Sequence, residues 1–382
     1  MQRITAFIAK ETSGVSFKTN KYTLDRGVQS IIDYDDAENN PLKRSGETPN
    51  QKGTINLTNH ANVLKGKAPL FRYFLDGSRR TYKVDDIIYN NKVFPVIAGQ
   101  IGVGCCQRIQ RQIKRYSIEN EKIHVIVLPE TSDKDGYKDN YFESLRKKIC
   151  AMEVLKKRNI VIHKVLYYKE SKKDDEKYDD LGVAKIQDEM IEMEKKAVAE
   201  LAKGDKLDNN AYLLKDGSLE YKIMGTGNYK DIAIIKTNYR WVVGASKSFN
   251  PEKCKDIQGN VNASGLAKLP LYHRTPACLY ESKISGSVKF AIWYVRIREA
   301  KYSYSPFDGI LKLEKILITA DEEEKGLETE ELNHITANII NERNPVAYGS
   351  DTRWANHLYP VFLTETFIKS KYLSSEYFLN LF

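Results

Sequence analysis

The order of the apolar segments between residues 69 and 214 restricts the fold of this 382-residue chain more than any other feature. Three strand-like runs come first: PLFRYFL (69–75), TYKVDDIIYNN (81–91) and KVFPVIAGQIGVGC (92–105). A helical stretch, VAKIQDEMIEMEKKAVAELAKG (183–204), then precedes a short apolar strand, AYLL (211–214). A strand period that gives way to a helix period predicts an α/β protein, with the first three runs forming an antiparallel meander.

Three strands, a long helix and a further strand ending in an acidic residue follow the order of RNase H-like folds. We therefore predict an RNase H-like mixed sheet flanked by helices. The polar, turn-rich residues 1–69 read as an N-terminal arm or cap, and residues 70–382 as the RNase H-like domain, with a charged insertion near 105–182. A C-terminal helical segment is expected to begin at Tyr359, where Pro360 suits the first turn.

Composition restricts the class of protein and the kind of site. No apolar run approaches the roughly 18 residues of a membrane span, and MQRITAFIAKE is interrupted too early for a signal peptide, so we expect a cytoplasmic protein without membrane contact. The five cysteines lack zinc-ligand spacing and a disulfide framework. Any metal would therefore have oxygen ligands. A net charge of +9 and a pI near 9.0 favour a polyanionic partner.

Asp-Gly occurs four times, at Asp76, Asp135, Asp216 and Asp308. A tight turn explains all four, because glycine accepts the positive φ that such turns need. Asp76 and Asp216 differ from the others because each is predicted to end an apolar strand and is followed by Gly-Ser. A carboxylate at the end of a buried strand needs a positive partner, which a divalent cation, an arginine or a hairpin N–H would supply.

The helix between these two aspartates contributes a third carboxylate. Glu194 lies on the predicted buried stripe with Met190, Ala197 and Val198, whereas Glu192 faces water. We therefore expect Glu194 to join Asp76 and Asp216 in holding metal. Carboxylates that hold two cations, Mn²⁺ or Mg²⁺, about 3.5–4 Å apart suit phosphodiester cleavage, because such ions activate water and stabilise the leaving oxygen.

At these residues the chain resembles the NurA nuclease family. The resemblance implies an RNase H-like homodimer with Mn²⁺-dependent DNA exonuclease and single-strand endonuclease activity. It also implies a HerA-type hexameric ATPase as partner, in DNA end processing or anti-phage defence. It spans roughly residues 70–370 and rests on FLDGSRRTYKV with Asp76, IEMEKKAVAEL with Glu194, LLKDGSLEYK with Asp216, VVGASKS with Lys247, then WYVRI, LKLE with Glu314 and YPVFL with Tyr359.

In such an enzyme Lys247 would meet a phosphate or the attacking water, and Glu314 and Tyr359 would line the active site. Each also has a plainer interpretation: a solvated lysine, an ion pair between Glu314 and Lys312 on one strand face, and a packing tyrosine among 24. The family's histidine after Tyr-Pro is absent from LTETFIKSK (363–371), so Glu365 or the upstream His357 would stand in its place.

The basic stretch CQRIQRQIKRYS, read as a helix face, would track a DNA backbone or form ordinary surface. Two further functions compete with the nuclease. One is a catalytically inactive RNase H-like scaffold that binds DNA or the ATPase. The other is an Argonaute-type guide-dependent nuclease, for which the chain is short and shows no guide-binding segment. The basic residues concerned are Arg108, Arg111, Lys114 and Arg115.

Overall fold

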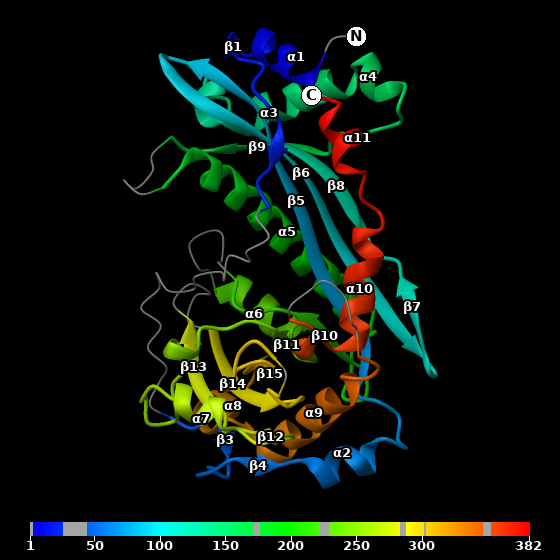
Figure 1. The fold of residues 1–382 in the computed structure, drawn as a ribbon, viewed down its shortest axis with the longest axis vertical. Helices are drawn as coiled ribbons and strands as arrows, with labels where there is room; N and C mark the ends of the chain where they lie inside the picture. The colour runs from blue at the N-terminus through cyan, green and yellow to red at the C-terminus, as the bar shows by residue number, and fades with distance from the viewer. Residues whose placement is uncertain are drawn as a thin grey trace.

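The computed structural model describes residues 3–25, 44–170, 176–221, 229–282, 288–301, 303–346 and 353–382. One mixed sheet runs through the molecule (Figure 1). Along its main path the strands follow in the order β4 (Ile55–Asn56), β12 (His273–Arg274), β14 (Val288–Arg296), β15 (Ile310–Ile316), β11 (Val242–Ser246), β10 (Tyr212–Asp216), β5 (Phe71–Tyr89), β6 (Lys92–Ile109), β8 (Lys122–Pro129) and β9 (Lys164–Tyr168).

Short strands extend this sheet at its sides. β1 (Val15–Ser16) and β2 (Tyr22–Thr23) pair with the second half of β5, β7 (Gln112–Tyr116) with β6, and β13 (Cys278–Ser282) with β14. β3 (Glu47–Thr48) and β16 (Leu327–Glu328) form a separate parallel pair. In the main sheet β5, β10 and β11 run parallel to one another, while β6 and β15 run antiparallel to their neighbours. The predicted mixed sheet is therefore present.

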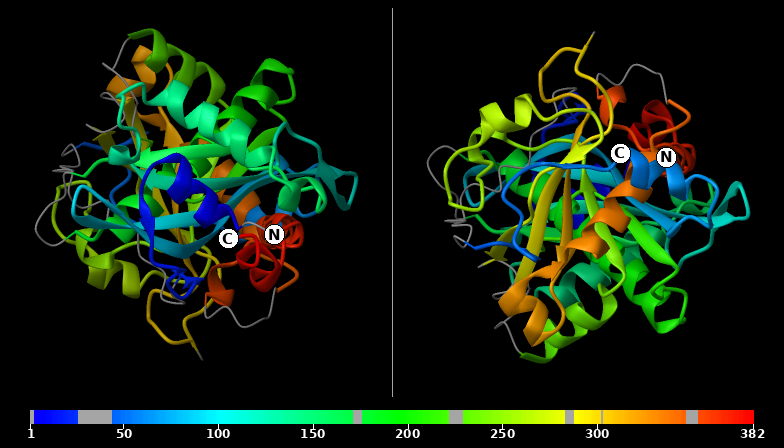
Figure 2. Two further views of the ribbon diagram at one scale, coloured as in Figure 1. Left: turned by 90° about the horizontal axis from the view of Figure 1, so that it is seen from above. Right: turned by 90° about the horizontal axis from the view of Figure 1, so that it is seen from below.

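Helices cover both sides of the sheet (Figure 2). Near the sheet's centre α5 packs on β5 and β6, and α10 packs on β5, β6 and β10. None of the described helices is both long and apolar enough to cross a membrane. The helices are α1 (Ile4–Glu11), α2 (Thr58–Leu64), α3 (Asp139–Cys150), α4 (Glu153–Lys156), α5 (Tyr178–Lys203), α6 (Tyr229–Asn238), α7 (Ala263–Ala267), α8 (Ala320–Lys325), α9 (Thr329–Glu342), α10 (Tyr359–Lys369) and α11 (Ser375–Leu379).

The first two predicted strands are one strand, so the prediction of a three-stranded meander is wrong. β5 continues through Asp76, Gly77 and Ser78 without a turn and pairs with β6 over almost its whole length. Gly77 does not have the positive φ of a turn glycine, and continuous pairing with β6 leaves no break at this point. The predicted turn at Asn90 and Asn91 is confirmed, since both residues have positive φ and close the β5–β6 hairpin.

The predicted charged insertion at 105–182 is mostly part of the sheet and its helices. It contains the end of β6, then β7, β8, α3, α4 and β9, while residues 171–175 lie outside the described part. The basic stretch after Cys105 is a hairpin between β6 and β7, not the predicted helix, with Gln110 at positive φ in its turn. Alternating Gln-Arg-Ile-Gln-Arg-Gln-Ile residues suit a half-exposed hairpin as well as a helix, and pairing with β6 decides between them.

The described residues before Leu70, 3–25 and 44–69, lie at two ends of the molecule (Figure 1). α1, β1 and β2 lie beside the far end of β5, where Ile4 N–H donates to Leu381 O at 3.3 Å and brings the two ends of the chain together. β3, β4 and α2 lie at the opposite end, where α2 packs against α9. A domain boundary near residue 69 stays a prediction.

Candidate active site

Asp76 and Asp216 are neighbours on adjacent parallel strands. The last registered pair between β10 and β5 is Lys215 with Leu75, so the next residues, Asp216 and Asp76, stand at the same level on strands about 4.8 Å apart. Asp216 ends β10, and Gly217 follows at φ +80°. The turn predicted for this Asp-Gly pair is therefore confirmed. The two aspartates predicted to converge therefore do so, although only Asp216 ends a strand.

Asp76 is a buried carboxylate without a hydrogen-bonded partner. Its exposed fraction is 4%, and no donor among the described residues forms a hydrogen bond or ion pair with it. Burial raises the pKa of Asp76 well above its ordinary value, and the negative charge of Asp216 raises it further, while Lys247 acts in the opposite direction. A buried carboxylate beside a second one is costly unless a cation compensates it.

Lys247 lies just beyond the end of β11 and carries the positive charge nearest to these aspartates. Its Nζ is 3.0 Å from Asp216 Oδ2 and 3.4 Å from Glu365 Oε2 on α10. Burial would lower the pKa of Lys247, but Asp216, Asp76 and Glu365 together raise it, so the ammonium stays charged. Asn356 anchors its backbone by donating to Lys247 O at 2.6 Å.

Glu365 is the third carboxylate on this side of the sheet. Burial opposes ionisation, but Lys247 and Lys369 prevail and lower the pKa of Glu365 to about 2. Lys369 Nζ lies 2.6 Å from Glu365 Oε1. Of the two residues considered in place of the missing histidine, Glu365 reaches the site. His357 is buried, stacks on Phe362 at 5.4 Å, and accepts a hydrogen bond from Arg298 through its backbone oxygen.

Glu194 lies on the opposite face of the sheet from Asp76. Asp76 pairs with Gly104 of β6, and a Cβ at Gly104 would contact α10. The next residue, Gly77, faces α5, where a Cβ would overlap Glu194 Oε1. Because successive residues of a strand point to opposite faces, Asp76 faces α10 and Glu194 lies against the α5 side. The predicted burial of Glu194 is confirmed at 5% exposure, but its partner is Lys215 Nζ at 2.9 Å.

Glu314 fastens the turn that follows Asp216. It is buried on β15, and its Oε2 accepts from Ser218 Oγ at 2.7 Å and from Leu219 N at 2.8 Å, while Lys312 Nζ lies 2.6 Å from Oε1. Although burial favours protonation, Lys312 and these two donors lower the pKa of Glu314. The same-face ion pair considered for Glu314 is thus present, and Glu314 holds the site's backbone.

Tyr359 begins α10, with Pro360 in the first turn as predicted. Its side chain is partly exposed. The helix positions Glu365 by packing Val361, Thr364 and Ile368 into the interior. Tyr359 therefore lies at the start of the element that delivers Glu365, and a role in chemistry stays a prediction.

The four basic residues of the β6–β7 hairpin have different environments. Arg108 donates two hydrogen bonds of 2.6 Å to the carboxylate of Glu342. Its guanidinium therefore forms part of an internal ion pair. Arg115 pairs with Glu121 at 2.7 Å and lies over the ring of Phe367 on α10. Arg111 and Lys114 are exposed to solvent. The hairpin thus offers two solvent-exposed positive charges, Arg111 and Lys114, while Arg115 contacts the helix that carries Glu365.

The oxygen-rich pair of aspartates suits Mg²⁺ or Mn²⁺. Among the residues that the structure describes, no three His, Cys, Asp or Glu side chains are grouped closely enough to hold one metal ion. Mg²⁺ is commonly bound through one or two carboxylates, with waters and substrate phosphates completing its shell. Asp76 and Asp216 meet that requirement, whereas Glu194 would have to leave Lys215 and cross the sheet.

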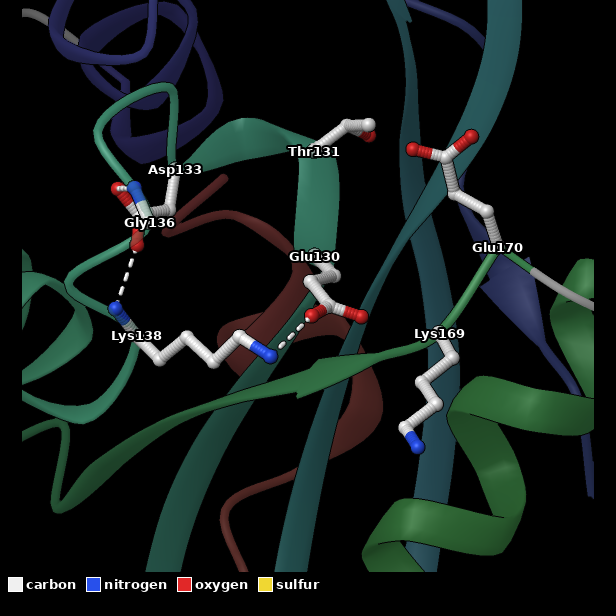
Figure 3. A pocket seen from close by; sticks show the side chains of 7 residues that line it. All are labelled: Glu130, Thr131, Asp133, Gly136, Lys138, Lys169 and Glu170. Carbon is white, nitrogen blue, oxygen red and sulfur yellow. Dashed lines mark hydrogen bonds and ion pairs between the residues drawn. The ribbon is translucent and has the colours of Figure 1, made fainter.

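A cavity of about 380 Å³ lies at the carboxyl ends of β8 and β9 (Figure 3). Val127 of β8 pairs with Ile97, and Gly104, the partner of Asp76, comes seven residues later on β6. Glu130 lies three residues beyond Val127, so ten residues separate the two levels, and at about 3.4 Å per residue the cavity is roughly 34 Å from the aspartates. It is lined by Glu130, Thr131, Asp133, Gly136, Lys138, Lys169 and Glu170.

Sequence reasoning missed Lys215 as part of the site. The sequence AYLLKD could have predicted it, because a lysine that follows apolar strand residues is expected to be buried on the face opposite to Asp216. Its exposed fraction is 3%. The significance of Gly77 was also missed, since Asp-Gly-Ser was interpreted as a turn in both copies.

Comparison with solved structures shows a structural similarity. No family model matches the chain, and no curated protein sequence matches it. A solved structure, the crystal structure of the NurA nuclease from Sulfolobus solfataricus, is similar with 10% sequence identity and a TM-score of 0.39. The similarity covers 81% of this chain and 86% of the other.

Proposed function

We propose that this chain is a metal-dependent nuclease that hydrolyses phosphodiester bonds in DNA. The observation that carries the proposal is the pair Asp76 and Asp216, level with each other on parallel strands. Asp76 is buried and has no hydrogen-bond donor among the residues that the structure describes. Two such carboxylates side by side form a site for a divalent cation. The net charge of +9 suits a polyanionic substrate.

Asp76 and Asp216 would hold the cation, Mg²⁺ or Mn²⁺, which polarises the phosphate and lowers the pKa of water when bound. Lys247 would hold a non-bridging phosphate oxygen, since its ammonium already lies among the carboxylates. Arg111 and Lys114 would contact the DNA backbone, and Tyr359 would line the active site. The two-ion arrangement expected from the sequence would need a third carboxylate. Glu365 would have to move closer to supply it, since no three such side chains among the described residues are grouped closely enough to hold a metal ion.

The finer activity follows the motifs that resemble the NurA family. These motifs support exonuclease and single-strand endonuclease action, a homodimer, a HerA-type hexameric ATPase as partner, and a role in DNA end processing or defence. Co-expression with a HerA-type ATPase and light-scattering of the purified chain test the two assemblies. A monomer that does not co-purify with the ATPase would remove both from the proposal.

The activity is tested with linear duplex and single-stranded DNA in Mn²⁺, Mg²⁺ or EDTA. Asp76→Asn and Asp216→Asn should each reduce cleavage by more than about 100-fold, since even outer-shell residues of metal sites cost 10–100-fold. Asp135→Asn is the matched control, because Asp135 is an exposed residue in another Asp-Gly pair. Full activity in either site variant, with its melting temperature unchanged, would remove the assignment.

A second candidate is a scaffold that binds DNA or an ATPase without cutting. This candidate is favoured because lysines already neutralise two of the predicted metal ligands. Lys247 pairs with Asp216, and Lys215 pairs with Glu194. The two candidates separate in one experiment. A scaffold would bind DNA equally in Mn²⁺ and EDTA and release no nucleotides, whereas a nuclease would release nucleotides only with the cation.

A further inference from the structure

The ammonium of Lys215 contacts both helix α5 and the backbone of the turn that follows Asp216 at the candidate active site. On the α5 side it lies 2.9 Å from Glu194 Oε2. It also donates to Asp216 O at 2.7 Å and to Ser218 O at 3.3 Å. These are the backbone oxygens on either side of Gly217, in the turn that directs the Asp216 side chain to the other face. Lys215 therefore connects Glu194 to the backbone of Asp216.

Glu194 has no direct route to the aspartates. Its Oε1 lies against the backbone of Gly77, where even a Cβ would not fit, and its Oε2 is taken by Lys215. Asp216 faces α10 because it pairs with Lys247, and Asp76 faces α10 because a Cβ at Gly104, its partner on β6, would contact that helix. The strand backbones of β5 and β10 separate the carboxylate of Glu194 from those of the two aspartates.

We propose that Glu194 and Lys215 are positioning residues, in which the buried ion pair fixes the Asp216–Ser218 turn from behind the sheet. Glu194 holds the Lys215 ammonium in place, and the ammonium holds two carbonyl oxygens of the turn. Glu314 fastens the same turn from its far end, through Ser218 Oγ and Leu219 N. With both ends held, the Asp216 carboxylate is preorganised beside Asp76.

This inference rests on the proposed metal-dependent function. It differs from the direct role that the sequence assigned to Glu194, since a ligand and a positioning residue have different consequences for metal binding. Removal of a ligand removes a bound ion or its coordination. Loss of a positioning residue keeps the number of ions and weakens their affinity, typically by 10- to 100-fold.

The first measurement is Mn²⁺ binding to the full chain, by titration calorimetry and by electron paramagnetic resonance. Glu194→Gln keeps the size and the acceptor oxygen but removes the charge. We expect the same number of Mn²⁺ ions per chain as in the parental protein, with a dissociation constant about tenfold higher. Loss of one Mn²⁺ per chain in Glu194→Gln would overturn the inference and make Glu194 a ligand.

The second measurement separates positioning from folding. Lys215→Met alone leaves Glu194 buried without its partner and is expected to unfold more readily. The double variant Lys215→Met with Glu194→Leu replaces the ion pair by apolar side chains, which restores stability in comparable buried pairs. We expect its melting temperature to return to the parental value while its Mn²⁺ affinity stays reduced about tenfold and kcat falls more than KM changes.

Recovery of both melting temperature and Mn²⁺ affinity in the double variant would overturn the inference, since the pair would then serve stability alone. Failure of the proposed function has a different signature. In that case the parental protein binds no Mn²⁺ that Asp76→Asn or Asp216→Asn removes, and the positioning role falls with it. A parental protein that binds Mn²⁺ through the aspartates isolates the behaviour of Glu194 and Lys215.

Discussion

Lys247 Nζ lies 3.0 Å from Asp216 Oδ2, and both groups are on the face of the sheet that α10 covers. The ammonium also reaches Glu365 and influences Asp76, so one lysine counters three carboxylates. An ammonium of this kind and a divalent cation satisfy the same negative charge. The site therefore has a built-in counter-charge that bound cations and substrate phosphates would share.

Replacement of this counter-charge tests the electrostatics of the site. Lys247→Met should lower the free energy of unfolding in EDTA by about 3–5 kcal/mol, because it removes the buried ammonium beside the buried Asp76 and the partly buried Asp216. Added Mn²⁺ should then raise its melting temperature more than that of the parental protein. Lys369→Met is the control, because that half-exposed lysine pairs with Glu365 near the surface and contributes at most about 1 kcal/mol. Equal stability of Lys247→Met and the parent in EDTA would contradict the prediction.

Gly77 tests the close approach of α5 to β5. Gly77→Ala should reduce the free energy of unfolding by about 1–3 kcal/mol, because the new Cβ meets Glu194 Oε1 and the buried, ion-paired side chain of Glu194 must shift. Gly53→Ala, with open space around position 53, should be neutral in the same urea titration. Addition of Glu194→Ala to Gly77→Ala should remove the steric part of the cost. A neutral Gly77→Ala would mean that Glu194 lies elsewhere.

His124 makes stability depend on pH. Burial lowers the pKa of His124 from 6.5 to about 4, and its Nε2 has no hydrogen-bond partner while Nδ1 lies 3.1 Å from Val161 O. Between pH 6.5 and 4 the unfolded chain binds a proton that the folded chain does not. Stability contributed by the neutral ring is therefore complete above pH 6.5 and is lost as the pH falls, by roughly 3 kcal/mol at pH 4.

Urea titrations from pH 7 to pH 4 check this dependence on His124. His124→Phe keeps a ring against Phe378, which His124 contacts at 5.5 Å. Its stability should fall less steeply over the same pH range, with some slope remaining from His163, whose pKa burial also lowers. An unchanged slope in His124→Phe would assign the acid sensitivity to other groups.

Two exposed basic residues of the β6–β7 hairpin test the proposed contact with DNA. Because each neutralised phosphate contributes about 0.9 to the salt dependence, Arg111→Ala and Lys114→Ala should each lower the slope of log K against log salt by about 1. Fluorescence anisotropy with a labelled oligonucleotide measures that slope. Arg108→Gln should leave it unchanged and instead destabilise the fold, because Arg108 pairs with Glu342. A slope that falls only in Arg108→Gln would place the DNA elsewhere.

Features set by neighbouring residues followed from the sequence. The Asn90–Asn91 hairpin, the turn after Asp216 and the start of α10 at Tyr359 and Pro360 were predicted from residue type and are present. The buried stripe that includes Glu194 was also predicted and is confirmed. Local φ/ψ preferences and a helical period of 3.6 residues decide such features, and both can be read from a short segment.

Only the tertiary structure decided which of these residues meet. Asp76 lies inside β5, because pairing with β6 and α5 against Gly77 outweigh the turn preference of Asp-Gly. Strand register, set by partners far along the chain, puts Asp76 and Asp216 on one face and Lys215 with Glu194 on the other. The same long-range packing pairs Arg108 with Glu342 and Glu365 with Lys247. Residue types along the sequence do not show which distant residues will form such ion pairs.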